Sequence, residues 1–468
     1  MSEDELFHQA FGEHTGVSDK CREKIERIRN NTNGLTYCNL DSRDVVQFTD
    51  QAWELLGRYI VNNNNLSKLV LRNCSLTDEK MVLLFRSLAR SESLTDLNLN
   101  ENSFGIEGVR CMIPFLQNSP NLTILNLGGN SNINNEGFKI LVQRLDGKSA
   151  TQLHCHNCNI TDISSLEVYN LPNLQTLNLS DNSIHSISAL DTYTLPNLET
   201  LCLNHNNIGR DGCIILSNLL KKEGSTLTAL LLAHTNMGDE EAEIIATSLK
   251  YNTTLKILDL RNNKGITERC YRTFLKLLVD VSSIENTYNS NHTLKNCFVG
   301  QYMRNDVLDR VYCEASAMNQ HGGSNPISIG RLKVIKYQLN STKRKNLCSL
   351  QGIEYCSNPF ADIEPILLPN IISLIGEKRG QSDLYAALLP MAPDLLSYID
   401  REAMIDSEVA KNMIEINALT QRLSVLSAKN QELSRRREII SLGSSSQQPT
   451  EEVGRKGTEI AGGKKRKV

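Results

Sequence analysis

The chain has 468 residues and a formal net charge of −3 at pH 7, so its bulk electrostatics do not favour nucleic-acid binding. It has no run of about 18 apolar residues, which excludes a predicted transmembrane helix. Its first ten residues are acidic and lack an apolar stretch, so we expect no signal peptide. We therefore expect an intracellular chain whose thirteen cysteines are reduced thiols.

The N-terminal residues 1–34 are polar and precede the main pattern of the chain. A short helix is predicted at residues 21–29. A second helix, carrying Trp53, is predicted at residues 45–61. We interpret both as a cap that covers the first unit of a repeat array.

From Leu66 onward one phrase recurs: leucine, two variable residues, leucine, one residue, leucine, two residues, then Asn or Cys. The alternation of leucines places them on one face of a short strand, and the Asn or Cys then turns the chain. Spacings of 24 to 29 residues between copies are typical of leucine-rich repeats. The copies begin at Leu66, Leu94, Leu122, Ala150, Leu174, Leu198, Leu227 and Leu255, with a partial first copy at Leu35 and a degraded last copy at Ile284.

Most copies continue with apolar residues spaced by three and four, which predicts an α-helix after the strand. Met81, Leu84 and Leu88 form the first such set. The two 24-residue copies lack room for a helix. Their return arms are predicted to be tight 3₁₀ turns that end at Pro172 and Pro196.

Over residues 35–300 this pattern resembles the leucine-rich repeats of the ribonuclease-inhibitor class. The two short copies resemble repeats of protein-phosphatase regulatory subunits. The resemblance implies an α/β solenoid in the form of a horseshoe, with a parallel β-sheet on the inner face and helices outside. It implies a shape and no particular chemistry, because members of the class differ in function.

After residue 300 the period stops, and residues 301–403 are predicted to form a helical C-terminal cap. Residues 404–442 show a heptad pattern, which predicts either a parallel coiled coil, and thus a homodimer, or one long helix packed on its own cap. The seam of that helix comprises Ile416, Leu419, Leu423, Leu426, Asn430 and Leu433. Residues 443–468 are rich in Ser, Gly and charge and are predicted to be disordered.

A basic cluster, Lys464, Lys465, Arg466 and Lys467, lies near the end of this tail. The sequence Lys-Lys-Arg-Lys-Val resembles a viral monopartite import signal without its leading Pro-Lys. The resemblance implies nuclear import, and the alternative is a solvated basic tail. We therefore expect a protein of the nucleus, the cytoplasm or both.

Cys155 and Cys158 have the spacing of half a metal site, but the repeat places both in the core. We expect structural cysteines, and neither a metal nor another cofactor. One column of residues on the inner strands combines an Asp with two His, which suggests acid–base chemistry or a hydrogen-bonded ladder. No nucleophile lies near it, so we interpret the column, Asn157, Asp181, His205, His234 and Asn262, as solvated or partner-contacting residues.

The concave strand face carries charges of both signs, which suits a protein partner better than a nucleic acid or a small-molecule substrate. The expected contact residues are Lys68, Arg72, Asp96, Glu101, His154, His156, Asp181, His205, His234, Asp259 and Arg261. We predict a non-enzymatic scaffold for protein–protein interaction. The alternative is a regulator of a small GTPase, because Ran GTPase-activating proteins have similar repeats; this chain lacks the acidic segment that follows theirs.

The repeat register predicts that Leu127 lies in the core. Replacement of Leu127 by Ala should then lower the free energy of unfolding by about 2–5 kcal/mol, the usual cost of a large-to-small change in a core. Chemical denaturation of the two proteins measures the difference. An unchanged denaturation midpoint contradicts the register.

Overall fold

The computed structural model describes residues 1–191, 195–299, 306–321, 329–330, 333–334, 337, 341–351 and 353–354. Ten strands of these residues form one parallel sheet and follow each other in chain order. Equivalent leucines are register partners, as Leu69 is of Leu97 and Leu97 is of Leu125. The strands are β1 (Tyr37–Asn39), β2 (Lys68–Val70), β3 (Asp96–Asn98), β4 (Ile124–Asn126), β5 (Gln152–His154), β6 (Thr176–Asn178), β7 (Thr200–Cys202), β8 (Ala229–Leu231), β9 (Ile257–Leu260) and β10 (Asn296–Val299).

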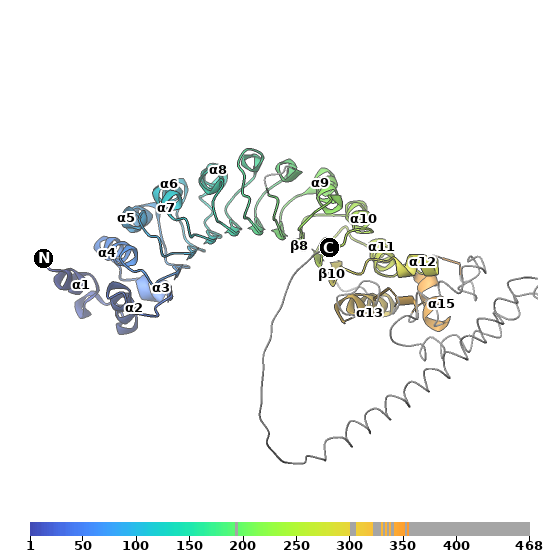
Figure 1. Cartoon of the computed structure of the whole chain (residues 1–468), viewed down its shortest axis with the longest axis horizontal. Helices are drawn as coiled ribbons and strands as arrows, with labels where there is room; N and C mark the ends of the chain where they lie inside the picture. Colours follow the sequence, from blue (N-terminus) through green and yellow to red (C-terminus); the bar gives the residue numbers. More distant parts are fainter. Residues whose placement is uncertain are drawn as a thin grey trace, which may run out of the picture. The chain divides into compact units, whose positions relative to one another are not determined.

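Helices connect most of the strands and lie on one side of the sheet (Figure 1). These are α4 (Asp50–Val61), α5 (Asp78–Leu88), α6 (Ile106–Cys111), α7 (Ile113–Asn118), α8 (Asn134–Leu145), α9 (Gly209–Lys221), α10 (Asp239–Ser248) and α11 (Glu268–Leu278). Pro114 lies at the start of α7 and lacks an N–H, which separates α6 from α7. The two short copies contain 3₁₀ turns instead, η2 (Ser164–Glu167) and η3 (Ser188–Asp191), as predicted, but each ends before the proline that was predicted to end it.

The core lies between the sheet and the helices. The third leucine of each phrase is fully buried there, which confirms the predicted register. These residues are Leu71, Leu99, Leu127, Leu179, Leu203, Leu232 and Leu260. The predicted helical residues Met81, Leu84 and Leu88 are also fully buried, so one apolar face of each outer helix closes the core.

A ladder of buried asparagines joins the coils, and Asn182 shows its geometry. Its Nδ2 donates to the carbonyls of Cys155 and Leu179, at 2.9 Å each. Its Oδ1 accepts the N–H groups of Cys158 and Ile160, at 3.0 Å each. One side chain therefore satisfies four buried backbone groups in two coils. Other asparagines donate in the same way to one carbonyl of their own coil and one of the preceding coil: Asn102, Asn130, Asn206 and Asn263.

A second ladder, which we did not predict, runs along the edge where the strands begin. The hydroxyl of Thr95 donates to the carbonyl of Ser67 at 3.1 Å, and that of Thr123 donates to the carbonyl of Thr95 at 3.0 Å. Ser67 and Thr151 continue the series in both directions. The first variable position of these copies therefore also connects neighbouring coils.

The N-terminal residues contain α1 (Glu3–Phe11) and α2 (Asp19–Arg29). Helix α2 contains the predicted segment, whereas α1 was not predicted. The single helix predicted at residues 45–61 is wrong in its extent: α3 (Ser42–Val45) ends early, and α4 begins after Thr49. The Thr49 hydroxyl accepts the N–H of Ala52 at 3.3 Å and caps α4, which fixes the new start.

The predicted last copy at Ile284 is wrong. That segment forms α12 (Ile284–Tyr288), and the tenth strand comes later in the chain. Leu294, Cys297 and Val299 occupy the three leucine positions of this strand and are buried. The inserted α12 lengthens the connection, so counting by the repeat period from Leu255 stops short of the true phrase.

Two described helices, α13 (Asp306–His321) and α15 (Ser341–Gln351), fall in the region predicted to be a helical cap. The predicted boundaries 1–34, 35–300 and 301–403 stay predictions. The heptad segment 404–442 and the basic tail 443–468 lie outside the described residues. Among the helices that are described, none has the length and apolar character needed to cross a bilayer.

The asparagine ladder predicts a large effect of one buried amide. Replacement of Asn182 by Ala should lower the free energy of unfolding by roughly 3 kcal/mol or more, because several buried backbone groups lose their partners. Asn197 is the matched control: it is exposed and donates one bond, to the Pro172 carbonyl at 2.7 Å. Asn197→Ala should cost less than about 1 kcal/mol. Equal denaturation midpoints for the two variants contradict this role of the ladder.

Candidate functional site

The strand face is formed by the strand side chains that alternate with the core residues. In β4, β5 and β6 the middle residue is buried, and the two flanking residues are partly exposed on the opposite side. This is the surface that we predicted to be the concave, partner-binding face. Side chains from ten adjacent strands lie on it in two columns.

At the N-terminal end of the strand face the predicted contact residues pair with each other. Lys68 of β2 bonds Asp96 of β3, with 2.6 Å between Nζ and Oδ2. Arg72 forms a two-point contact with Glu101, at 2.5 and 3.1 Å. The Arg72 guanidinium lowers the pKa of Glu101, so this carboxylate stays ionised. These four charges form two neutral pairs.

The C-terminal end repeats this arrangement. Arg261 makes two bonds to Asp259, at 2.6 and 2.9 Å, although the two residues are only two positions apart. The same guanidinium lies over the ring of Phe298, with its Cζ 4.8 Å from the ring centroid. Asp259 is buried and Phe298 is exposed, so the end of the sheet presents an aromatic ring held by an arginine.

Between these ends the strand face carries no Asp, Glu, Lys or Arg in β4 to β8. Its side chains there are Ile124, Asn126, Gln152, His154, Thr176, Asn178, Thr200, Cys202, Ala229 and Leu231. A strand face of mixed sign was expected. The structure separates it into two charged, internally paired ends and an uncharged centre.

His154 of β5 belongs to this centre, and His156 follows it just beyond the strand. Burial lowers the pKa of both imidazoles, so both are neutral at pH 7. The ring of His156 occupies the space above Gly128, where an added Cβ atom would lie 2.0 Å from its Cε1. Gly128 therefore leaves room for this ring.

The column of residues that was predicted to lie on the inner strands has a different position. Its members lie one turn beyond the strands, in the left-handed region, with φ between 51° and 60°. These residues are Asn157, Asp181, His205, His234 and Asn262. Asn, Asp and His are the non-glycine residues that adopt this region most readily. The composition of the column thus reflects backbone geometry rather than catalytic chemistry.

The two histidines of this column also differ from the predicted hydrogen-bonded ladder. The rings of His205 and His234 stack, with centroids 4.0 Å apart and planes tilted by 16°. Nδ1 of His205 lies 4.0 Å from an oxygen of Asp181, at the limit of an ion pair. The stack forms a flat aromatic surface at the margin of the strand face.

Cys155 and Cys158 are both buried in the core. Burial raises the pKa of the Cys158 thiol to about 11, and its Sγ donates to the Leu127 carbonyl at 3.4 Å. Cys158 thus takes the place of a ladder asparagine. Within the described residues, no three His, Cys, Asp or Glu side chains gather in a group that could hold a metal ion.

Two exposed aromatic residues on the strand face were missed by the sequence analysis. Tyr37 of β1 is 51% exposed and Phe298 of β10 is 42% exposed. They lie on the two outermost strands of the sheet. The signal was present in the sequence for Tyr37, because it precedes the core residue Cys38. Phe298 was missed because the last copy was predicted to begin at Ile284, so the strand that carries Phe298 was not predicted.

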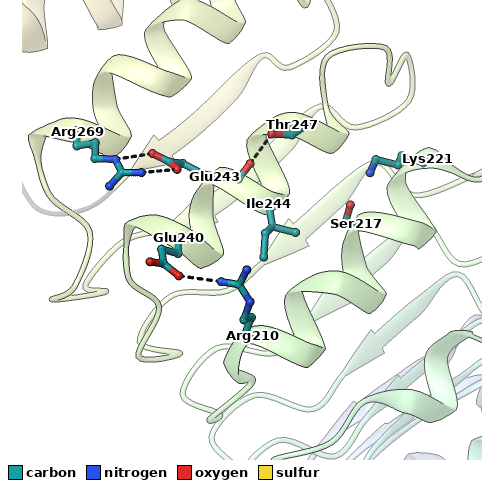
Figure 2. Close-up of a pocket in the computed structure, with 8 residues that line it drawn as sticks. All are labelled: Arg210, Ser217, Lys221, Glu240, Glu243, Ile244, Thr247 and Arg269. Carbon is teal, nitrogen blue, oxygen red and sulfur yellow. Dashed lines mark hydrogen bonds and ion pairs between the residues drawn. The ribbon is translucent and has the colours of Figure 1, made fainter.

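The helix side has a hollow of about 550 Å³ over α9, α10 and α11 (Figure 2). Four of the five charged side chains that line it pair across neighbouring helices, and Lys221 is the fifth. Arg210 bonds Glu240 at 2.8 Å, and Arg269 makes two 2.9 Å contacts with Glu243. We interpret this hollow as the groove between adjacent outer helices, in which these ion pairs neutralise each other's charges.

Comparison with known families supports the repeat assignment. A family described as leucine-rich repeats in two copies matches residues 151–192 and 172–220. A second, described as a leucine-rich repeat, matches residues 118–139 and 251–268. The chain contains leucine-rich repeats. No curated protein sequence matches it.

Several solved structures are similar to parts of the leucine-rich-repeat chain. The tropomodulin C-terminal domain of Caenorhabditis elegans is 15% identical, with 37% of this chain and 87% of that chain covered and a TM-score of 0.26. An internalin C2 of Listeria monocytogenes is 24% identical over 46% and 76%, with a TM-score of 0.29. Another internalin of this bacterium is 14% identical over 66% and 95%, with a TM-score of 0.39. These likenesses are too distant to assign a function.

The contact between Gly128 and His156 is testable. Gly128→Ala should destabilise the protein by about 1–3 kcal/mol, because the new methyl group displaces the His156 ring. The same change in a His156→Ala background should cost less, and the double-mutant cycle should give a coupling of about 1 kcal/mol. Thermal or chemical denaturation of the four proteins measures it. Simple additivity means that the ring does not occupy this space.

Proposed function

We propose that this protein is a non-enzymatic scaffold that binds a partner protein on the strand face of its repeats. The observation that carries the proposal is the uncharged centre of that face between two ends of paired charges. Protein interfaces have this arrangement, with few charges at the centre and a polar rim. We also propose that these repeats are of the ribonuclease-inhibitor class.

The centre of the strand face suits binding for a second reason. Its side chains, among them Ile124, Thr176 and Leu231, lie on strands held by the two ladders. A rigid surface loses little conformational entropy on binding. At the two ends of the strand face, Tyr37 and Phe298 offer the aromatic side chains that frequently dominate the free energy of an interface.

The paired charges fit the rim of this interface. In this proposal the charged residues of the two ends fix the orientation of the partner: Lys68, Arg72, Asp96, Glu101, Asp259 and Arg261. His154 contacts the partner from within the centre, and the residues that border the centre are His156, Asp181, His205 and His234. Exposed ion pairs at a rim contribute little affinity and affect mainly the rate of association. Dimerisation through residues 404–442 and nuclear import through residues 464–467 are further proposals, and both segments lie outside the described residues.

Two arginines placed at the centre test the proposal. Thr176→Arg combined with Leu231→Arg introduces unpaired charges where an interface would be dry. Proteins bound to the immobilised full chain should be reduced by about tenfold or more, the expected cost of a buried unpaired charge. Quantitative mass spectrometry of the bound proteins measures the loss.

The control is Val168→Arg on the helix side, where Val168 is 72% exposed. This variant should retain the same bound proteins as the wild type. Retention by the double-arginine variant, with the fold intact by circular dichroism, places the binding surface elsewhere. Phosphate release from GTP-loaded small GTPases, stimulated by the chain, would instead favour the GTPase-regulator alternative.

A further inference from the structure

The two edge strands of the sheet, β1 and β10, differ in how far other parts of the chain cover them. At the C-terminal edge, α13 covers β10: Tyr312 Oη donates to the Cys297 carbonyl at 3.0 Å, and Ser316 Oγ donates to the Lys295 carbonyl at 2.9 Å. At the N-terminal edge, β1 pairs with β2 alone. An open edge strand presents a row of backbone donors and acceptors to other chains.

The hydrogen bonds of β1 show which backbone groups are open. The Leu40 N–H donates to the Val70 carbonyl at 3.0 Å, and the Thr36 carbonyl accepts the Lys68 N–H at 2.9 Å. In a parallel ladder alternate residues bond the same neighbour, so the backbone groups of Tyr37 and Asn39 point away from the sheet. Among the described residues, the only side chain that bonds them is Lys24, whose Nζ donates to the Asn39 carbonyl at 2.8 Å.

A hollow of about 300 Å³ lies along this edge, between α2 and β1. Lys20, Lys24 and Arg27 line it from one face of α2. Tyr37, Cys38 and Asn39 of β1 line it from the other side, together with Leu35 just before the strand. Lys24 is paired with Asp44 at 2.6 Å. Neither Lys20 nor Arg27 forms an ion pair with a residue that the structure describes, so both can pair with carboxylates of a partner.

We propose that the β1 edge binds an extended acidic segment of a partner protein as an added strand. The backbone groups of Tyr37 and Asn39 supply the main-chain hydrogen bonds, as in other cases of strand addition. Alternate residues of the segment face Lys20 and Arg27, which selects carboxylates at those positions. This site shares Tyr37 with the end of the strand face, but strand addition at β1 does not depend on the function proposed for that face.

Charge also decides against a second copy as the occupant. Pairing of two β1 edges would bring two sets of Lys20 and Arg27 together, and like charges at short distance repel. The competing interpretation is that Lys24 protects the edge from any strand, since lysine is a common guard at edges. That interpretation predicts no binding of an extended peptide.

Fluorescence anisotropy of the full chain with a short labelled peptide of alternating Thr and Glu tests the proposal. The peptide should bind, and one of alternating Thr and Lys should not. Lys20→Glu with Arg27→Glu should weaken binding by at least about tenfold, since two attractive charges become repulsive. Lys139→Glu, an exposed charge reversal on α8, should leave binding unchanged.

A backbone variant separates strand addition from simple charge attraction. Asn39→Pro removes an outward N–H and leaves the bonds of Thr36 and Leu40 to β2. It should abolish binding of the Thr-Glu peptide. In the wild type, the peptide should also slow hydrogen exchange at the amides of Tyr37 and Asn39, which tests the site even if the proline variant does not fold.

Three results overturn the proposal. The first is absence of binding by the Thr-Glu peptide, which supports the guard interpretation. The second is unchanged exchange at Tyr37 and Asn39, or full binding by a folded Asn39→Pro protein, which shows attraction without strand addition. The third is a dimer of the free chain that Asn39→Pro dissociates, which makes a second copy the occupant.

Discussion

The buried turn that ends each strand sets the main physical constraint on this solenoid. Its backbone groups are removed from water, and each needs a hydrogen-bond partner. Asn182 and its equivalents supply these partners from within and from the next coil. Since one side chain serves two coils, the period of the sequence and the spacing of the coils cannot vary independently.

The same turn explains residues that at first suggest chemistry. The residue before each ladder asparagine adopts a left-handed conformation, and the N–H of Asp181 donates to the Asn204 carbonyl of the next coil at 2.8 Å. Asn, Asp and His tolerate that conformation best, so they gather in this column whatever the protein does. An Asp beside two histidines is here a consequence of backbone geometry, and the stacked rings of His205 and His234 follow from the distance between coils.

Function then depends on the side chains that the solenoid does not need for its own stability. The strand side chains are not needed for the core or the ladders, so their chemistry can follow a partner. Charges occur there only near the ends and are paired across or along strands, as Lys68 is with Asp96. The two edge strands of the sheet also differ. Side chains of α13 donate hydrogen bonds to carbonyls at β10, whereas β1 has outward-pointing backbone groups beside the cations of α2.

The sequence by itself determined the repeat, the strand register, the buried leucines and the 3₁₀ turns of the short copies, because periodic burial is a local property of spacing. It misplaced the last strand, since the inserted α12 interrupts that period before Leu294. Of the predicted contact residues, Lys68, Asp96, His154 and Asp259 lie in strands, and the other seven follow the strands in the chain. It did not show that Arg72 pairs with Glu101, that His156 fills the space over Gly128, or that β1 is open while β10 is covered. Only the tertiary structure decided these features, because each depends on the distance between side chains or backbone groups in different coils, which spacing along one chain does not specify.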